Sequence, residues 1–238
     1  MIRSRSETLR VDMAFDYRNS RTMSLGARLN EDRLRVMSYG LAYDFADSFE
    51  GSNLVSFRFS HGLDVLHSTI TGTNNMTRAE GRSDFRKLTF STQHLQPLSE
   101  GFGLTVGGEG QWSPDRLLSS EEFGIGGSQY GRAFDSSELT GDRGVAGKVE
   151  LSYTPQLEIP SLNYFQVYTF ADIGGANNYE DGKTRHGWQT LASAGGGVRF
   201  GVTDYLSATL EVAKPFLRNT SAANDHDGRG FFSLTARY

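Results

Sequence analysis

The chain has 238 residues with 28 glycines, five prolines, no cysteine and a net charge of −4, a composition that predicts many turns and no thick apolar core. The absence of cysteine excludes disulfides, a thiol nucleophile and thiolate-bound metals, and the acidic balance argues against a dedicated nucleic-acid binder. No stretch approaches the roughly 20 uncharged apolar residues of a membrane helix, whereas a membrane β-barrel is still allowed because half of each strand faces a polar lumen.

Apolar and polar residues alternate along much of the chain. In the first such segment Leu9, Val11 and Met13 alternate with polar residues, and on a helical wheel they would scatter over opposite sides. The same pattern predicts ten strands, at 8–18, 37–45, 55–60, 85–96, 102–112, 144–153, 163–173, 188–200, 204–214 and 230–238. Apart from 55–60 these segments have roughly 9–13 residues, which is long for a soluble domain and suits tilted membrane strands.

The expected connections alternate between long and short. The long ones are about 19–33, 62–84, 113–143, 174–187 and 215–229, and the short ones are 46–52, 97–101, 154–162 and 201–203. Outer-membrane barrels sort their connections in this way because one rim carries tight periplasmic turns and the other carries exposed loops. The pattern predicts an all-β, antiparallel transmembrane barrel wall, which a soluble sandwich or lipocalin-like barrel would not explain.

The charged face of each strand is expected to line the lumen. Arg or Lys against lipid at mid-bilayer costs about 2–4 kcal/mol, so the face that carries Arg10, Asp12 and Arg18 must point inward. The same parity places Glu150 and Asp172 on the lumen side of their strands.

The long connection 113–143 is unusually rich in glycine and apolar residues. Its segment from Phe123 to Asp135 includes Ile125, Tyr130 and Phe134, which are too apolar for a freely exposed loop. We therefore expect a loop that folds back tightly and packs on another surface. A phosphate-binding loop is not expected, because the glycines neither follow a parallel strand nor open a helix.

No pattern of an enzyme or a cofactor site is present. The five histidines show no ligand spacing, and no serine lies in a nucleophile elbow. Asp225-His226-Asp227 lies in a hydrophilic connection and is interpreted as solvated polar sequence rather than a metal site. We predict neither enzymatic activity nor a cofactor.

The last strand ends on an aromatic residue. Phe232, Leu234 and Tyr238 lie on one face of it. Such an ending resembles the signal by which the bacterial barrel-assembly machinery recognises its clients. The resemblance implies insertion into the outer membrane by that machinery.

Several segments resemble the haemolysin secretion/activation family, the outer-membrane translocators of two-partner secretion. They are Gly126-Gly127, Gly131-Arg132-Ala133-Phe134, Gly141-Asp142-Arg143-Gly144, Glu150-Leu151, Gln93-His94-Leu95-Gln96-Pro97-Leu98, Gln111-Trp112, Phe170-Ala171-Asp172-Ile173-Gly174 and Ala213-Lys214-Pro215-Phe216. The resemblance implies that residues 1–238 form one domain, the last ten strands of a sixteen-strand barrel, with the first strands, a plug helix and two POTRA domains absent from this sequence. The opening residues also lack the apolar segment of a signal peptide, so we expect sequence before Met1.

The resemblance also implies a site. The family's loop usually reads Val-Arg-Gly followed by Tyr or Phe and folds into the lumen, which identifies 113–143 as the lumen-inserted loop. The Arg pairs with an inward Asp, so Arg132 is expected to pair with Asp172, only partly desolvated because a lumen holds water. The candidate site residues are Gly126, Gly127, Gly131, Arg132, Phe134, Gly141, Asp142 and Gly144 in the loop, Glu150 and Asp172 on the wall, and Phe232, Leu234 and Tyr238 in the last strand.

The function implied is a protein-conducting pore component of the bacterial outer membrane that exports a large partner exoprotein of the haemolysin or adhesin type. Its expected partners are the exoprotein, outer-membrane lipid and the barrel-assembly machinery, with no nucleic acid. Two alternatives remain, a barrel-assembly or insertion factor of the same superfamily and a passive porin. Ten strands from a sixteen-strand design would leave unpaired edges near 8–18 and 230–238, so we expect a curved open sheet or a strained closure.

Overall fold

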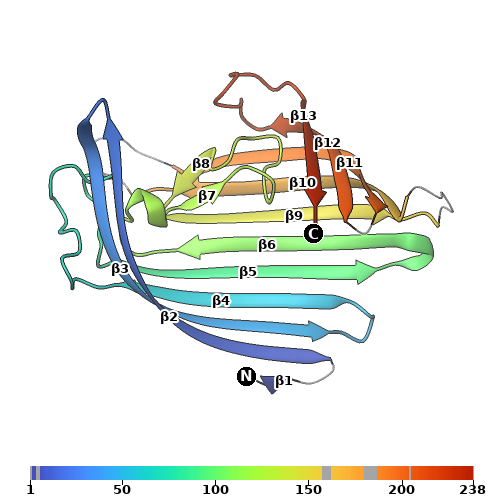
Figure 1. Ribbon diagram of the computed structural model, residues 1–238, viewed down its shortest axis with the longest axis horizontal. Coiled ribbons are helices and arrows are strands. Elements are labelled where there is room, and N and C mark those ends of the chain that lie inside the picture. Colours follow the sequence, from blue (N-terminus) through green and yellow to red (C-terminus); the bar gives the residue numbers. More distant parts are fainter. Residues whose placement is uncertain (1, 4–5, 157–161, 180–186, 204, 238) are drawn as a thin grey trace.

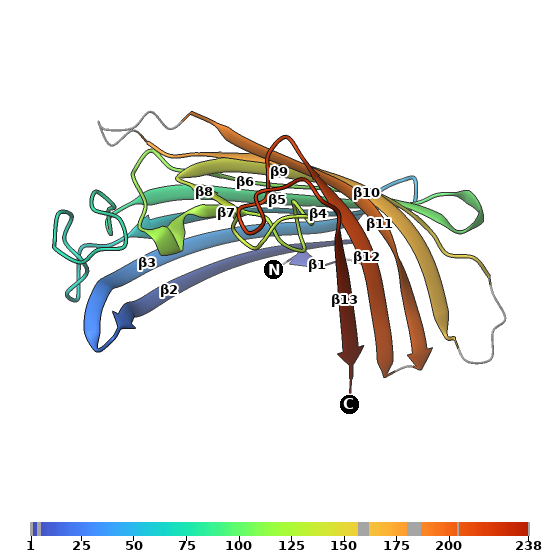
Figure 2. The same ribbon diagram turned by 90° about the horizontal axis from the view of Figure 1, so that it is seen from above.

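The computed structural model describes residues 2–3, 6–156, 162–179, 187–203 and 205–237, which form one 11-stranded sheet and a small 2-stranded sheet (Figure 1). In spatial order the large sheet contains β1 (Ile2–Arg3), β2 (Glu7–Ser24), β3 (Ala27–Ala46), β4 (Ser52–Gly62), β5 (Arg86–Pro97), β6 (Phe102–Trp112), β9 (Arg143–Tyr153), β10 (Tyr164–Asn177), β11 (Gln189–Thr203), β12 (Leu206–Phe216) and β13 (Arg229–Ala236). All neighbouring strands are antiparallel. The sheet curves without pairing β1 to β13, as expected for an open wall (Figure 2).

The small sheet lies within the β6–β9 connection and pairs β7 (Phe123–Ile125) with β8 (Leu139–Gly141). Figure 2 shows this connection on the concave side of the large sheet. The helices of the described residues are two three-residue 3-10 turns, η1 (Ser99–Gly101) and η2 (Ser119–Glu121). Neither is long and apolar enough to cross a membrane.

The two faces of the wall differ as the alternation predicts. Across β2 and β3 the register places Val11 opposite Leu41 and Met13 opposite Tyr39, so apolar side chains from both strands share one face. Val11 and Met13 are each 68% exposed, an unusual state for such residues in water. The other face carries the charged residues and receives the β6–β9 connection. The prediction of an all-β, antiparallel barrel wall with ten long strands is confirmed.

One expected connection is wrong. Residues 19–33 are not a long loop, because β2 and β3 continue as one hairpin to a tight turn at Leu25 and Gly26. Both turn residues have positive φ, 48° and 81°, as in the turns that match the twist of a hairpin. The segment looked like a loop because its charged residues lie on both faces. A strand that extends into water beyond the bilayer needs no apolar face.

The other connections follow the predicted parity, although several strand bounds shift by a few residues. The β4–β5 and β6–β9 connections lie at one end of the strands, and the β3–β4 and β5–β6 turns at the other (Figure 1). β10 extends beyond residue 173 to Asn177, and β11 extends to Thr203, so the whole of the expected turn 201–203 is strand. The short and long ends therefore define a periplasmic and a surface rim.

The core lies between the wall and its connections rather than between two sheets. One buried apolar cluster joins the β6–β9 connection to the concave face of β9–β12. A second joins Leu34 and Val36 of β3 to Phe85, Leu117 and Leu118 of the connections. The long connections are thus packed parts of the fold.

Candidate functional site

The tip of the β6–β9 connection is built on left-handed glycines. Gly126, Gly127 and Gly131 have φ of 120°, 94° and 75°, a region that other residues enter only with strain. A Cβ on Gly126 would lie 2.1 Å from the carbonyl oxygen of Asp135. The chain folds back here because the Gly127 N–H donates to the Phe134 carbonyl at 3.2 Å. This tight tip places Arg132 at the wall.

Apolar side chains hold the tip against the wall. Phe134 is only 2% exposed and belongs to the same buried cluster as Tyr168 and Phe170 of β10 and Leu191 of β11. Burying such a side chain contributes about 1.5–3 kcal/mol. The loop therefore packs on the concave face as the sequence predicts, and burial of apolar side chains contributes to holding it there.

Arg132 sits at the centre of the charged face. Its backbone N–H donates to Asp172 Oδ2 at 3.1 Å, and its Nη2 donates to Asp172 Oδ1 at 3.3 Å. Nη1 contacts Glu150 Oε2 at 2.8 Å and Glu211 Oε2 at 3.4 Å, so one guanidinium joins carboxylates of β9, β10 and β12. The guanidinium carbon also lies 3.7 Å from the centroid of the Phe170 ring. The structure thus brings together the predicted residues Arg132, Asp172 and Glu150.

This pair is drier than the sequence analysis expected. The side chain of Arg132 is 5% exposed and that of Asp172 is 0% exposed. The expectation of a wet, partly desolvated pair is wrong, because both side chains are buried where the β6–β9 connection, which carries Arg132, packs on the wall, which carries Asp172. Burial alone would lower the pKa of Arg132, but the charge of Asp172, followed by Glu150 and Glu211, raises it above the ordinary value. Arg132 therefore stays charged.

Neighbouring wall residues fix the acceptors in place. Ser193 Oγ donates to Asp172 Oδ2 at 3.1 Å, and Tyr168 OH donates to Glu211 Oε2 at 2.7 Å. Arg199 donates to both oxygens of Glu150 at 2.7 and 3.1 Å. Each carboxylate that contacts Arg132 thus has a second hydrogen-bond donor on the wall, which supports its orientation.

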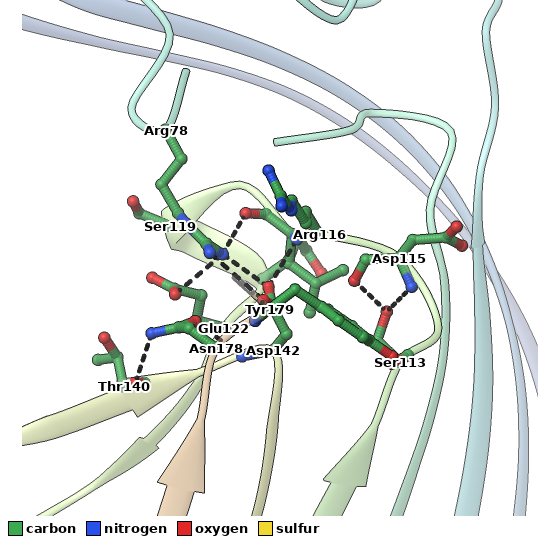
Figure 3. Close-up of polar contacts among 12 residues, drawn as sticks. Arg78, Ser113, Asp115, Arg116, Ser119, Glu122, Thr140, Asp142, Asn178 and Tyr179 are labelled. Carbon is green, nitrogen blue, oxygen red and sulfur yellow. Dashed lines mark hydrogen bonds and ion pairs between the residues drawn. The ribbon is translucent and has the colours of Figure 1, made fainter. Parts of the chain in front are cut away.

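A second polar network holds the root of the same connection at the surface rim (Figure 3). Asp142 follows β8 directly and is 0% exposed. Its Oδ1 accepts from Arg78 Nη1 at 2.6 Å and from the Leu117 N–H at 2.8 Å. Its Oδ2 accepts from Arg78 Nη2 at 3.3 Å and from the Tyr179 N–H at 2.9 Å. One carboxylate therefore ties the β4–β5, β6–β9 and β10–β11 connections together; we call this network the root clasp.

The remaining predicted residues have separate roles. A Cβ on Gly144 would lie 2.0 Å from Phe123 Cδ1, and one on Gly141 would lie 2.8 Å from the Asn177 nitrogen, so both glycines allow close packing. Phe232 and Leu234 of β13 lie opposite Leu210 and Ala208 of β12 on the outer face, 65% and 58% exposed. Tyr238 lies outside the described residues.

Sequence reasoning missed part of both networks. Glu211 alternates with apolar neighbours on its strand, so its parity alone could have placed it inside the wall. Arg78 lies in a polar connection that offers no signal of its partner, and Asp142 was named without one. Asp225 and His226 lie in the β12–β13 connection, and no metal-binding group of three or more acidic, histidine or cysteine side chains occurs in the described part of the chain.

Together these features define a class of protein. An antiparallel wall with an apolar outer face, a charged inner face and loops sorted by rim is the architecture of an outer-membrane β-barrel. The family described as haemolysin secretion/activation protein ShlB/FhaC/HecB matches residues 1–200, so the chain belongs to this family. It is an outer-membrane protein homologous to the transporters of two-partner secretion, as the sequence motifs predict.

Individual relatives agree with the family assignment. The outer membrane transporter CdiB of Escherichia coli O6:K15:H31 (strain 536 / UPEC) is 24% identical over 211 residues, which cover 80% of this chain and 35% of that protein. The outer membrane transporter CdiB of Dickeya dadantii (strain 3937) is 29% identical over 193 residues, which cover 80% of this chain and 33% of that protein. The chain thus spans about a third of the length of these curated relatives.

Solved structures show the same fold. CdiB from Escherichia coli superposes with a TM-score of 0.82 at 18% identity, over 99% of this chain and 43% of that one. CdiB from Acinetobacter baumannii gives a TM-score of 0.77 at 18% identity, over 100% of this chain and 40% of that one.

Proposed function

We propose that the chain forms part of the wall of a protein-conducting pore that exports a partner exoprotein, of the haemolysin or adhesin type, from the periplasm to the cell surface. The observation that carries the proposal is the Arg132 cluster, in which one loop arginine bridges acidic groups of β9, β10 and β12. In this proposal the β6–β9 connection occupies the lumen and sets the state of the pore. Export would need no nucleotide hydrolysis, since the exoprotein would cross in an extended form and fold outside.

The Arg132 cluster suits such a role because its ion pairs hold the loop on the wall, while the carboxylates have other hydrogen-bond donors when Arg132 leaves. When Arg132 leaves, Asp172 and Glu211 keep hydrogen bonds from Ser193 and Tyr168, so the wall retains its form. The departing loop would leave an acidic strip along the pore. Such a strip would repel acidic segments of a translocating chain and attract basic ones.

The experiment compares export by cells that produce the natural protein together with its exoprotein. We expect Arg132→Ala to insert into the membrane in parental amount and to reduce the exoprotein in the medium. Arg82→Ala is the matched control, because Arg82 lies at the surface rim in an exposed ion pair with Asp84. Parental export by Arg132→Ala would refute the proposal.

The same strains separate the alternatives. A barrel-assembly factor would lower the amounts of other outer-membrane barrels when Arg132 is replaced. A passive porin would keep the same single-channel conductance after loop substitutions and would not be needed for export.

We also propose that β13 is the segment read by the barrel-assembly machinery and that the outer face contacts lipid. Phe232 and Leu234 support this, because they are exposed on the apolar face of the last strand. We expect Phe232→Ser to reduce the amount of inserted protein, whereas Ser233→Ala, a change on the opposite face, should not. Equal insertion of both variants would contradict this assignment.

A further inference from the structure

The outer face of the β2–β3 hairpin changes character above Tyr17. Below that level it carries Met13 and Phe15, and above it most of the outward positions are polar or charged. The register pairs Tyr17 with Arg35, Asn19 with Arg33 and Arg21 with Glu31, so these side chains share the apolar face of the wall. A basic cluster therefore stands directly above the apolar band, at the surface rim.

A bulge adds another arginine to this face. The register shifts between Thr22 and Met23, and Met23 pairs with Arg28 instead of Leu29. An extra residue in one strand turns the following side chains to the opposite face. The shift thus brings Arg28 to the outward side with Arg21 and Arg33.

Three of these arginines converge on a single carboxylate. Arg21, Arg28 and Arg33 contact Glu31 at 3.5, 2.6 and 2.8 Å. Their side chains are 56%, 49% and 43% exposed, while that of Glu31 is 11% exposed. One acid cannot neutralise three guanidiniums, so the group keeps an excess of positive charge that faces outward.

Arg35 supports this excess from beneath. It is 1% exposed, and its guanidinium donates to the carbonyl oxygens of Arg18, Leu34 and Leu66 and to the Asn19 side chain. It also stacks 3.5 Å from the centroid of the Tyr17 ring. None of these partners is a carboxylate, so the charge of Arg35 adds to the field of the cluster.

A groove beside the cluster offers space for a ligand. Its volume is about 350 Å³, and its lining includes Arg28, Glu31, Arg33, Ser68, Thr69 and Asn75. Guanidiniums beside hydroxyl and amide groups are the donors that phosphate oxygens accept. Two arginines of neighbouring connections differ, because each has a carboxylate of its own: Arg82 of the β4–β5 connection pairs with Asp84, and Arg116 of the β6–β9 connection pairs with Glu80.

The height of the cluster suits a lipid headgroup. Strands rise about 3.3 Å per residue, so Arg21 lies about 13 Å further along β2 than Tyr17, and strand tilt reduces its height above the band. Aromatic residues at the ends of an apolar band mark the level of the interface. The arginines therefore stand where the phosphates of outer-leaflet lipid lie.

We propose that the outer face of the β2–β3 hairpin, with Arg21, Arg28 and Arg33, binds the phosphate groups of lipid A in the outer leaflet of the outer membrane. The bound glycolipid would place its acyl chains along the apolar band and its phosphates at the arginines. The site fixes the depth of the hairpin in the membrane. It depends on membrane location alone and not on what the pore exports.

The experiment counts bound lipid on the natural full-length protein. Protein is purified in detergent, delipidated, and titrated with diphosphorylated lipid A under native mass spectrometry. We expect the triple variant Arg21→Gln/Arg28→Gln/Arg33→Gln to bind at least a hundredfold more weakly, from about fivefold for each basic residue at an anionic surface. The matched control Arg82→Gln/Arg86→Gln/Arg116→Gln removes as many arginines from the same rim and should bind as the parent does.

Two further titrations identify the ligand chemistry. Monophosphorylated lipid A should bind several-fold more weakly than the diphosphorylated form, and inorganic phosphate should not compete at millimolar concentration. Equal lipid A binding by the parent and the triple variant would overturn the proposal, as would full competition by inorganic phosphate. Circular dichroism of the variants guards against misfolding, and Arg33→Lys, which keeps the charge, should retain most of the binding.

Discussion

The substitution Asp142→Asn tests whether the root clasp holds the surface connections together. Each carboxylate oxygen of Asp142 accepts two hydrogen bonds, one from Arg78 and one from a backbone N–H. Whichever oxygen is replaced by the amide NH2 of Asn, that NH2 donor then faces one Arg78 N–H and one backbone N–H, which are also donors. The charge of Arg78 also loses its fully buried partner, although Glu122 Oε1 remains 3.0 Å from Arg78 Nη1.

The expected magnitude follows from this geometry. Breaking a buried ion pair costs about 3–5 kcal/mol. The side chain of Arg78 is 23% exposed and keeps Glu122, so the lower end of that range applies. About 3 kcal/mol raises the population of the open clasp roughly a hundredfold or more.

Hydrogen exchange reads this opening directly, because Leu117 and Tyr179 donate their own amide hydrogens to Asp142. In the protein purified in detergent we expect peptides containing these two amides to exchange about a hundredfold faster in Asp142→Asn. The control Asp84→Asn removes an exposed pair with Arg82, which is worth about 0–1 kcal/mol. Unchanged exchange at both amides would refute the clasp, and equal acceleration in Asp84→Asn would show a nonspecific effect.

Three further substitutions test other parts of the wall by urea unfolding of the protein in lipid vesicles. Gly131→Ala should destabilise by about 1–3 kcal/mol, because it forces a left-handed alanine whose Cβ lies 2.7 Å from Leu191 Cδ1; an unchanged midpoint would contradict the strained tip. Phe134→Ala should cost about 3–5 kcal/mol because this side chain is 2% exposed, and a loss under 1 kcal/mol would mean that the loop is not packed in the membrane. Leu41→Arg should cost about 2–4 kcal/mol if the apolar face meets lipid, whereas Ala42→Arg on the other face should cost less; equal losses would contradict the orientation of the wall.

The fold was largely predictable from the sequence, because successive side chains of a barrel strand point to opposite faces of the wall. Lipid on one face and water on the other force a period of two, and a charged residue at a lipid position is too costly to hide the pattern. The prediction of a loop at 19–33 was wrong because this segment lies beyond the bilayer, where lipid no longer imposes the alternation. Above the bilayer neither face of β2 or β3 meets lipid, so charged residues such as Arg21 and Glu31 pair on the outer face and no regular alternation marks the strands.

The site was only partly readable. Family resemblance and strand parity predict the residues of the loop motif and Asp172 as site residues, and the glycines predict a tight tip. The burial of Arg132 and Asp172 does not follow from the sequence, because it depends on how the whole connection packs on the wall. Arg78 and Asp142 are 64 residues apart in sequence, and no local pattern specifies a contact between two irregular connections.

The two networks divide the control of one connection between its tip and its root. Arg132 fixes the tip to β9, β10 and β12, while Asp142 fixes the root to the neighbouring connections at the surface rim. The networks share no residue, so in the proposed function the tip would leave the wall while the clasp remains closed. Because β9 begins at Arg143, immediately after the clasp, a closed clasp also keeps the wall intact during such a movement. A loop that moves inside a barrel needs this separation, since a root that opened with the tip would unravel the wall at β9.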